Sequence, residues 1–109
     1  MALESAIMIH VIATVTVKPG TRAEFLRIFS ANVPAVLAED GCLAYQPTVD
    51  TTSEIPDMPA LRENVSVVVE KWQSLDHLKA HLDASHMATF RDDVKDIVET
   101  VDLQVLEEA

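Results

Sequence analysis

Residues 7–24, IMIHVIATVTVKPGTRAE, set out the first strand, turn and helix of the fold. Every odd position from 7 to 17 is apolar, whereas most even positions carry polar side chains. This period of two predicts a strand with one wholly apolar face. Pro19-Gly20 interrupts the strand, and Thr21 with Glu24 three residues later predicts a capping box that opens a helix.

The predicted helix continues through an apolar stripe between Phe25 and Leu37. Pro34 falls inside it and predicts a kink, because proline lacks the N–H and clashes with the preceding turn. Gly41 suits the left-handed conformation that ends a helix. A short second strand then covers residues 42–48, where Pro47 indicates an edge position or a bulge.

The second half of the chain repeats the strand–helix–strand pattern. A polar loop at residues 49–62 precedes a third strand, residues 65–72, which is apolar on both faces. Ser74 predicts the cap of a helix, and a further helical patch occupies residues 87–97. The residues that should face the core from the capped helix are Leu75, Leu78 and Leu82.

The alternation of Val101, Leu103 and Val105 with polar residues predicts the final strand. The order of elements is β-α-β-β-α-β, which is typical of a ferredoxin-like α+β fold with an antiparallel sheet. We expect residues 1–109 to form a single domain with its core at 7–106. Since the helices can cover only one face of the sheet, a second copy of the chain is expected to cover the other, giving a homodimer through the sheet.

Composition restricts the partners. Eighteen acidic residues against eight basic ones give a formal charge of −10, which disfavours binding to nucleic acid and to anionic lipid. A membrane span would need an apolar run of about 20 residues, which the chain lacks, and its first residues do not resemble a signal peptide. We therefore expect a cytoplasmic protein. Cys42 is the single cysteine, so neither an intrachain disulfide nor a thiolate metal cluster can form.

Three of the four histidines lie within residues 77–86. On one helix His77 and His81 would be about 40° apart, whereas His86 would be about 180° from His77, so a three-histidine metal face is not expected. His77 should be exposed. His81 falls at the boundary of the buried stripe, where it could line a pocket or simply flank the helix. His10, on the polar face of the first strand, is expected to be partly buried at the dimer interface.

Trp72 ends the third strand directly before the helix that carries His81, and it shares strand parity with Glu70. A buried tryptophan is often plain core. An indole and an imidazole that meet at the end of a sheet would also form a site for a flat aromatic ligand. The residues alone leave both possibilities open.

Four motifs occur in a characteristic order: Val17-Lys-Pro-Gly20, Glu39-Asp-Gly-Cys-Leu-Ala-Tyr45, Glu70-Lys-Trp72, and His81-Leu-Asp-Ala-Ser-His86 followed by Phe90. Together they resemble the antibiotic biosynthesis monooxygenase family, which includes quinol monooxygenases. The resemblance implies a dimeric α/β barrel made from two ferredoxin-like domains. It also implies a monooxygenase that oxidises quinol-like or polycyclic phenolic substrates with O2 and requires no flavin, haem or metal.

The same resemblance implies roles for individual residues. His81 is expected to bind or deprotonate the phenolic hydroxyl, with Trp72 as a stacking wall. Tyr45, Glu70 and His86 are expected to bind substrate. Two other functions stay open: an isomerase or other acid–base catalyst on a small carbonyl metabolite, and a dimer that binds a small molecule without turnover. A phosphorylated carbonyl substrate would require cations in the pocket, for which the candidates are Arg62, Lys71 and Arg91.

Overall fold

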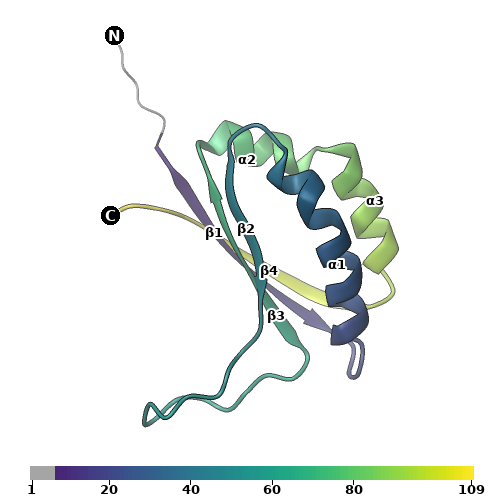
Figure 1. Ribbon diagram of the computed structural model, residues 1–109, viewed down its shortest axis with the longest axis vertical. Coiled ribbons are helices and arrows are strands. Elements are labelled where there is room, and N and C mark those ends of the chain that lie inside the picture. Colours follow the sequence, from purple (N-terminus) through teal and green to yellow (C-terminus); the bar gives the residue numbers. More distant parts are fainter. Residues whose placement is uncertain (1–6) are drawn as a thin grey trace.

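The computed structural model describes residues 7–109 as one four-stranded antiparallel sheet with three helices on one of its faces (Figure 1). The strand order is β2-β3-β1-β4. This arrangement confirms the predicted ferredoxin-like α+β fold. The elements in chain order are β1 (Ile9–Val17), α1 (Arg22–Leu37), β2 (Cys42–Thr48), β3 (Val65–Trp72), α2 (Leu75–Leu82), α3 (Ser85–Val94) and β4 (Val98–Glu107).

The central strand β1 explains how the core is built. Its residues alternate between buried and half-buried from one end to the other, as the period of two predicted. The buried side faces the helices, where Phe25 and Phe29 of α1 pack on it. Antiparallel pairing sets Val11 opposite Glu70 and Ala13 opposite Val68, so the buried side of β3 lies beside the buried side of β1.

Helix α1 begins differently from the prediction. The Thr21 hydroxyl donates to the Lys18 carbonyl at 2.6 Å instead of accepting from the helix, and Glu24 pairs with Arg27 at 2.7 Å. The predicted capping box is therefore wrong. The tight turn at Gly20, with φ of 81°, folds the chain back so that Lys18 is the nearer partner for the hydroxyl. The helix then continues through Pro34 to Leu37.

Gly41 lies in the turn between α1 and β2 and not directly at the helix end, which is capped by Ala38. Its φ of 79° is the left-handed conformation that glycine adopts readily. A Cβ at this position would clash with the ring of His77. The absence of a side chain therefore lets α2 approach the start of β2 closely.

The second helical segment is broken into α2 and α3. Helix α2 has eight residues and packs on β3, and the side chains that it buries are Leu78 and His81. Leu75 and Leu82 are 44% and 39% exposed, so the predicted stripe of three leucines is wrong. A helix of eight residues has only about two turns, so few of its side chains can face the sheet. In α2 these are Leu78 and His81, while Leu75 and Leu82 remain exposed.

The face of the sheet opposite the helices carries half-buried or exposed apolar side chains. Ile12 of β1 pairs with Val69 of β3, and Val67 lies two residues along on the same face. β2 lies at the edge of the sheet, as Pro47 indicated, and its register shifts at its start, between Cys42 and Ala44. Within residues 7–109, no helix has the length and apolar character required to cross a membrane.

The connection between β2 and β3 extends away from the rest of the protein as an arm (Figure 1). Two charge-assisted hydrogen bonds close its base, from the Arg62 guanidinium to the Asp50 carboxylate at 2.8 and 2.9 Å. This pairing lowers the pKa of Asp50 to about 2. The arm therefore leaves the sheet at a defined place, where Arg22 at the start of α1 also donates a hydrogen bond of 3.0 Å to the Arg62 carbonyl.

Candidate functional site

A cavity of about 440 Å³ lies between the sheet and helices α1 and α3. This volume suits a small molecule. Most of its lining is apolar and aromatic, and the polar groups that reach it from the sheet and from α2 are Tyr45, Glu70 and His81. An apolar cavity with a few convergent polar groups is the usual form of a small-molecule site.

His81 is 2% exposed and is fixed by the side chain of Glu39. Its Nδ1 lies 2.9 and 3.2 Å from the two carboxylate oxygens. Since a carboxylate can only accept hydrogen bonds, Nδ1 carries the proton and Nε2 is left as the acceptor. Burial lowers the pKa of His81, and the hydrogen bond to Glu39 opposes that effect. The imidazole is therefore neutral near pH 7 and can accept a proton at Nε2.

Trp72 lies one layer behind the cavity. It has no exposed surface, and its ring centroid is 4.6 Å from that of His81. The indole Nε1 donates a hydrogen bond of 3.0 Å to Oε1 of Glu70. Trp72 thus packs behind the imidazole and orients the carboxyl group that lines the cavity.

Glu70 is 6% exposed, and burial raises its pKa to about 7 despite the opposing hydrogen bond from Trp72. The folded protein therefore holds a proton on Glu70 between about pH 4.5 and 7, whereas the unfolded chain has released it. Because the native state then binds more protons, stability from this group falls as pH rises through that window.

We expect Glu70→Gln to flatten that part of the pH dependence and to raise the melting temperature at pH 8, where Glu70 is ionised in a buried place. Glutamine keeps the oxygen that accepts from Trp72. Melting curves of both proteins at half-unit steps from pH 4.5 to 8 measure the difference. Parallel curves for the two proteins would show that Glu70 is not a buried acid.

Tyr45 of β2 forms a second side of the site. Its ring stacks on Phe29 at a centroid distance of 5.2 Å and meets His81 edge-on at 5.4 Å. Burial, and to a lesser degree the charges of Glu70 and Glu39, raises the pKa of Tyr45. Its hydroxyl therefore stays protonated at physiological pH and can donate a hydrogen bond to a bound ligand.

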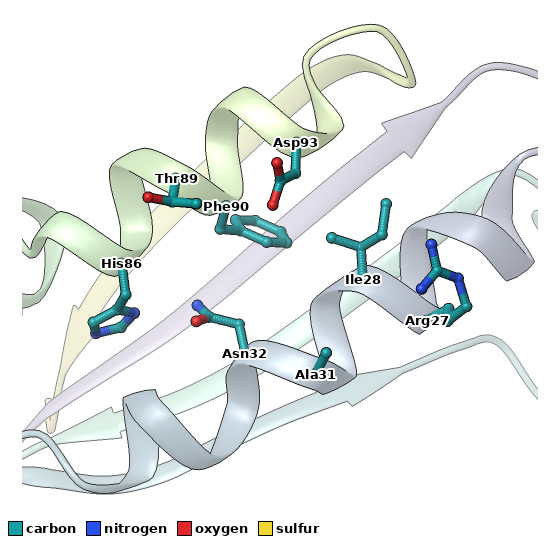
Figure 2. Close-up of a pocket in the computed structure, with 8 residues that line it drawn as sticks. All are labelled: Arg27, Ile28, Ala31, Asn32, His86, Thr89, Phe90 and Asp93. Atoms are coloured by element: carbon teal, nitrogen blue, oxygen red, sulfur yellow. The ribbon is translucent and has the colours of Figure 1, made fainter.

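His86 lies next to the cavity and not on its lining. It is in the first turn of α3, and its Nε2 is 2.8 Å from Oε2 of Glu39. The chain bends between α2 and α3, so the 180° separation expected for one continuous helix does not apply. A second groove of about 560 Å³ runs between α1 and α3, with His86 at one end of it (Figure 2).

His77 is partly buried, so the prediction of an exposed side chain is wrong. Its Nδ1 lies 2.6 Å from the Ser74 hydroxyl, and its Nε2 lies 3.4 Å from a carboxylate oxygen of Asp40. The close approach at Gly41 explains the burial. Over residues 7–109 no group of three histidine, cysteine or carboxylate side chains has the geometry to hold a metal ion.

Glu39 is the site residue that the sequence did not single out. It lies two residues beyond the end of α1 and contacts histidines that are 42 and 47 positions away in the chain. A single acidic residue in a strongly acidic chain carries no distinguishing pattern. Its place in the motif that ends at Tyr45 was the one signal available.

The fold and the cavity define a class: a ferredoxin-like α+β protein with an aromatic small-molecule site built around a buried histidine. Comparison with known proteins narrows the class. The profile of the family described as "Antibiotic biosynthesis monooxygenase" matches residues 8–93. The chain belongs to this family.

Among curated proteins, the chain is 34% identical over 102 residues to "Probable quinol monooxygenase YgiN" of Escherichia coli, covering 92% of this chain and 97% of that protein. Solved structures share the fold. PA3566 from Pseudomonas aeruginosa has a TM-score of 0.80 at 22% identity, covering 98% of this chain and 99% of the other. A protein from Caulobacter crescentus has a TM-score of 0.75 at 29% identity, covering 96% and 92%.

Proposed function

We propose that the protein is a cofactor-independent monooxygenase that oxidises quinol-like or polycyclic phenolic substrates with O2. The observation that supports it most is the neutral His81 in the wall of an apolar cavity, held by Glu39 at Nδ1 and without a hydrogen-bond partner at Nε2 within residues 7–109. Such a group can take the proton of a phenol, which is the step that makes an electron-rich ring reactive toward O2. The name of the Escherichia coli relative supports the same substrate class.

The proposed chemistry needs no external reductant. His81 removes the hydroxyl proton, and the phenolate transfers one electron to O2. The resulting radical and superoxide combine at a ring carbon as a peroxide, whose O–O bond then breaks. One oxygen atom stays on the ring and the other leaves as water, while the substrate supplies all the electrons. A quinol thus becomes a hydroxyquinone, and an anthrone becomes an anthraquinone.

Other groups of the cavity stabilise the reacting anion. The Tyr45 hydroxyl and the protonated form of Glu70 are hydrogen-bond donors at the pocket surface, and donors in a water-poor site stabilise developing negative charge strongly. Phe29 and Phe90 supply flat apolar surfaces for the ring. These donors therefore raise the ionised fraction of the bound phenol above that in an apolar pocket without donors.

The test is oxygen uptake by metal-stripped protein supplied with reduced naphthoquinols or anthrones, after subtraction of spontaneous oxidation. We expect enzyme-dependent uptake with equal amounts of O2 and substrate consumed, and one atom of ¹⁸O from labelled O2 in each product molecule. Uptake no faster than in buffer across these substrates would contradict the proposal. Formation of hydrogen peroxide with no label in the product would indicate an oxidase.

A second candidate is an acid–base reaction on a small anionic carbonyl metabolite. The observation that favours it is that two cations, Arg91 and Lys95, line the cavity. Of the other cations considered from the sequence, Arg62 pairs with Asp50 in the arm and Lys71 lies on the opposite face of the sheet. Isomerisation of a phosphorylated carbonyl compound without oxygen uptake would select this function.

We also propose that two copies of the chain associate through the open face of the sheet, because Ile12, Val67 and Val69 would otherwise remain in contact with water. Sedimentation at micromolar concentration should give a dimer. Val69→Lys should shift it to a monomer, since it places a charge at the centre of the buried face. Lys79→Glu, on the exposed side of α2, is the matched control and should leave the dimer unchanged. A wild-type monomer would contradict this assembly.

A further inference from the structure

One carboxylate oxygen joins two histidines of different helices. Oε2 of Glu39 lies 2.9 Å from Nδ1 of His81 and 2.8 Å from Nε2 of His86. The three side chains are respectively 16%, 2% and 29% exposed. They form a continuous row of proton-carrying groups that leads from the cavity wall to the end of the groove between α1 and α3.

His86 is the unusual member of this row. Both of its ring nitrogens are closed to solvent, and within residues 7–109 neither has a partner in hydrogen-bonding geometry. Nε2 lies 2.8 Å from Oε2 of Glu39, which is close enough for an ion pair, but the ring is not oriented for a hydrogen bond. A buried, unsatisfied imidazole is unfavourable and calls for a reason. A small rotation of the ring would let it share a proton with Glu39.

We propose that Glu39 and His86 together store the proton that His81 removes from the substrate and return it later in the cycle. The inference rests on the proposed function, since it assumes an acidic hydroxyl in the cavity. The substrate O–H bond breaks and an N–H bond forms at Nε2 of His81. The Nδ1 proton of His81 then moves to the Glu39–His86 pair, and no proton leaves the protein.

The store solves a problem of timing. An imidazolium beside a phenolate in a cavity of low dielectric attracts it strongly, and the proton would return before O2 arrives. Transfer to Glu39 leaves a neutral His81 whose Nε2–H donates a hydrogen bond to the phenolate. When the peroxide needs a proton, Nε2 supplies it and Nδ1 recovers its own from Glu39. The original tautomer of His81 is thereby restored.

Glu39 and His86 are accordingly positioning residues that act through His81. The experiment measures the ionised fraction of bound 4-nitrophenol in the absence of O2, because the neutral and ionised forms of this probe absorb at different wavelengths. The same proteins are then assayed for oxygen uptake with a quinol. The variants are Glu39→Gln and His86→Ala, the latter with and without added imidazole, which is small enough for the enlarged groove.

Asp40 and His77 provide matched controls, because they form a neighbouring carboxylate–histidine pair, whereas His81 pairs with Glu39. Asp40→Asn and His77→Ala should leave both readouts at wild-type values. We expect Glu39→Gln to bind the probe in its neutral form and to lower the rate of oxygen uptake about 10²-fold. His86→Ala should lower the rate of oxygen uptake about tenfold, since it removes only the far end of the row. Imidazole should restore both readouts in His86→Ala, which a purely structural role would not permit.

Each outcome decides the matter. Wild-type values in both variants, or a loss in His86→Ala that imidazole does not restore, would overturn the proton store while leaving the monooxygenase proposal intact. A wild-type protein that ionises the probe through Glu39 and His86 but takes up no oxygen would support the store and contradict the proposed function. Ionisation and uptake both absent in wild type would contradict both. If Glu39→Gln does not fold, the His86→Ala variant, at a partly exposed position, tests the proposal by itself through the imidazole experiment.

Discussion

His81→Ala is expected to lower turnover by about 10²–10⁴-fold while the fold and the oligomeric state stay unchanged. Among the described residues that line the cavity, His81 is the one imidazole, and it is neutral near pH 7, so the substitution removes the proposed base. The remaining donors would still bind the phenol, so the loss should appear in kcat more than in KM. Oxygen uptake over a range of quinol concentrations measures both constants.

Lys79→Ala is the control for this experiment, because Lys79 lies on the exposed side of the same helix, two residues before His81. It should retain wild-type kinetics. Equal kcat in His81→Ala and wild type would remove His81 from the mechanism. A fall in kcat accompanied by a lower melting temperature in His81→Ala would instead indicate damage to the core, and circular dichroism of each protein separates the two cases.

Trp72→Ala is expected to destabilise the protein by about 3–5 kcal/mol, the usual range for removing a buried tryptophan. This is a large part of the ~5–15 kcal/mol that stabilises a typical domain. Trp72 has no exposed surface, supports the His81 ring and satisfies Glu70, so its loss leaves a cavity and an unpaired buried carboxyl group. Urea unfolding followed by circular dichroism is the measurement, since the variant removes the single tryptophan.

Trp72→Phe separates packing from hydrogen bonding. Phenylalanine fills much of the same space but cannot donate to Glu70, so the expected loss is about 1–3 kcal/mol. An equal loss in the two variants would mean that the hydrogen bond, and not the volume of the indole, carries the stabilisation. Less than 1 kcal/mol for Trp72→Ala would contradict the buried position itself.

The strands were predictable from local sequence patterns: alternation for β1 and β4, and a short apolar run for β3. The bounds of β2 and β3 agree with the prediction, and β1 differs only at its first residues. A strand of period two has one way to place its apolar face on a core. The predicted Ser74 cap of α2 is confirmed, because its hydroxyl accepts from the backbone N–H of His77 at 3.3 Å. The start of α1 and the inward face of α2 were not predictable in the same way. They depend on which partner is nearer in space, as Lys18 is for Thr21.

The candidate site was predictable in its histidine and not in its carboxylate. Trp72 and His81 lie close together in sequence, so their meeting follows from the strand-to-helix turn between them. Glu39 follows the end of α1 and lies 42 residues before His81 in the chain, a separation that only the folded chain closes. The break between α2 and α3 likewise turned His86 toward the same carboxylate, which an uninterrupted helix would have prevented.

Gly41 is a position near this site where a side chain has no room. It lies between Glu39 and Tyr45 in the chain and packs directly against the ring of His77. A side chain there would clash with His77 of α2, the helix that also carries His81. The alignment of acid and base therefore depends on an empty space, and a change of one methyl group, far from any substrate, would act as a misalignment of the whole reaction centre.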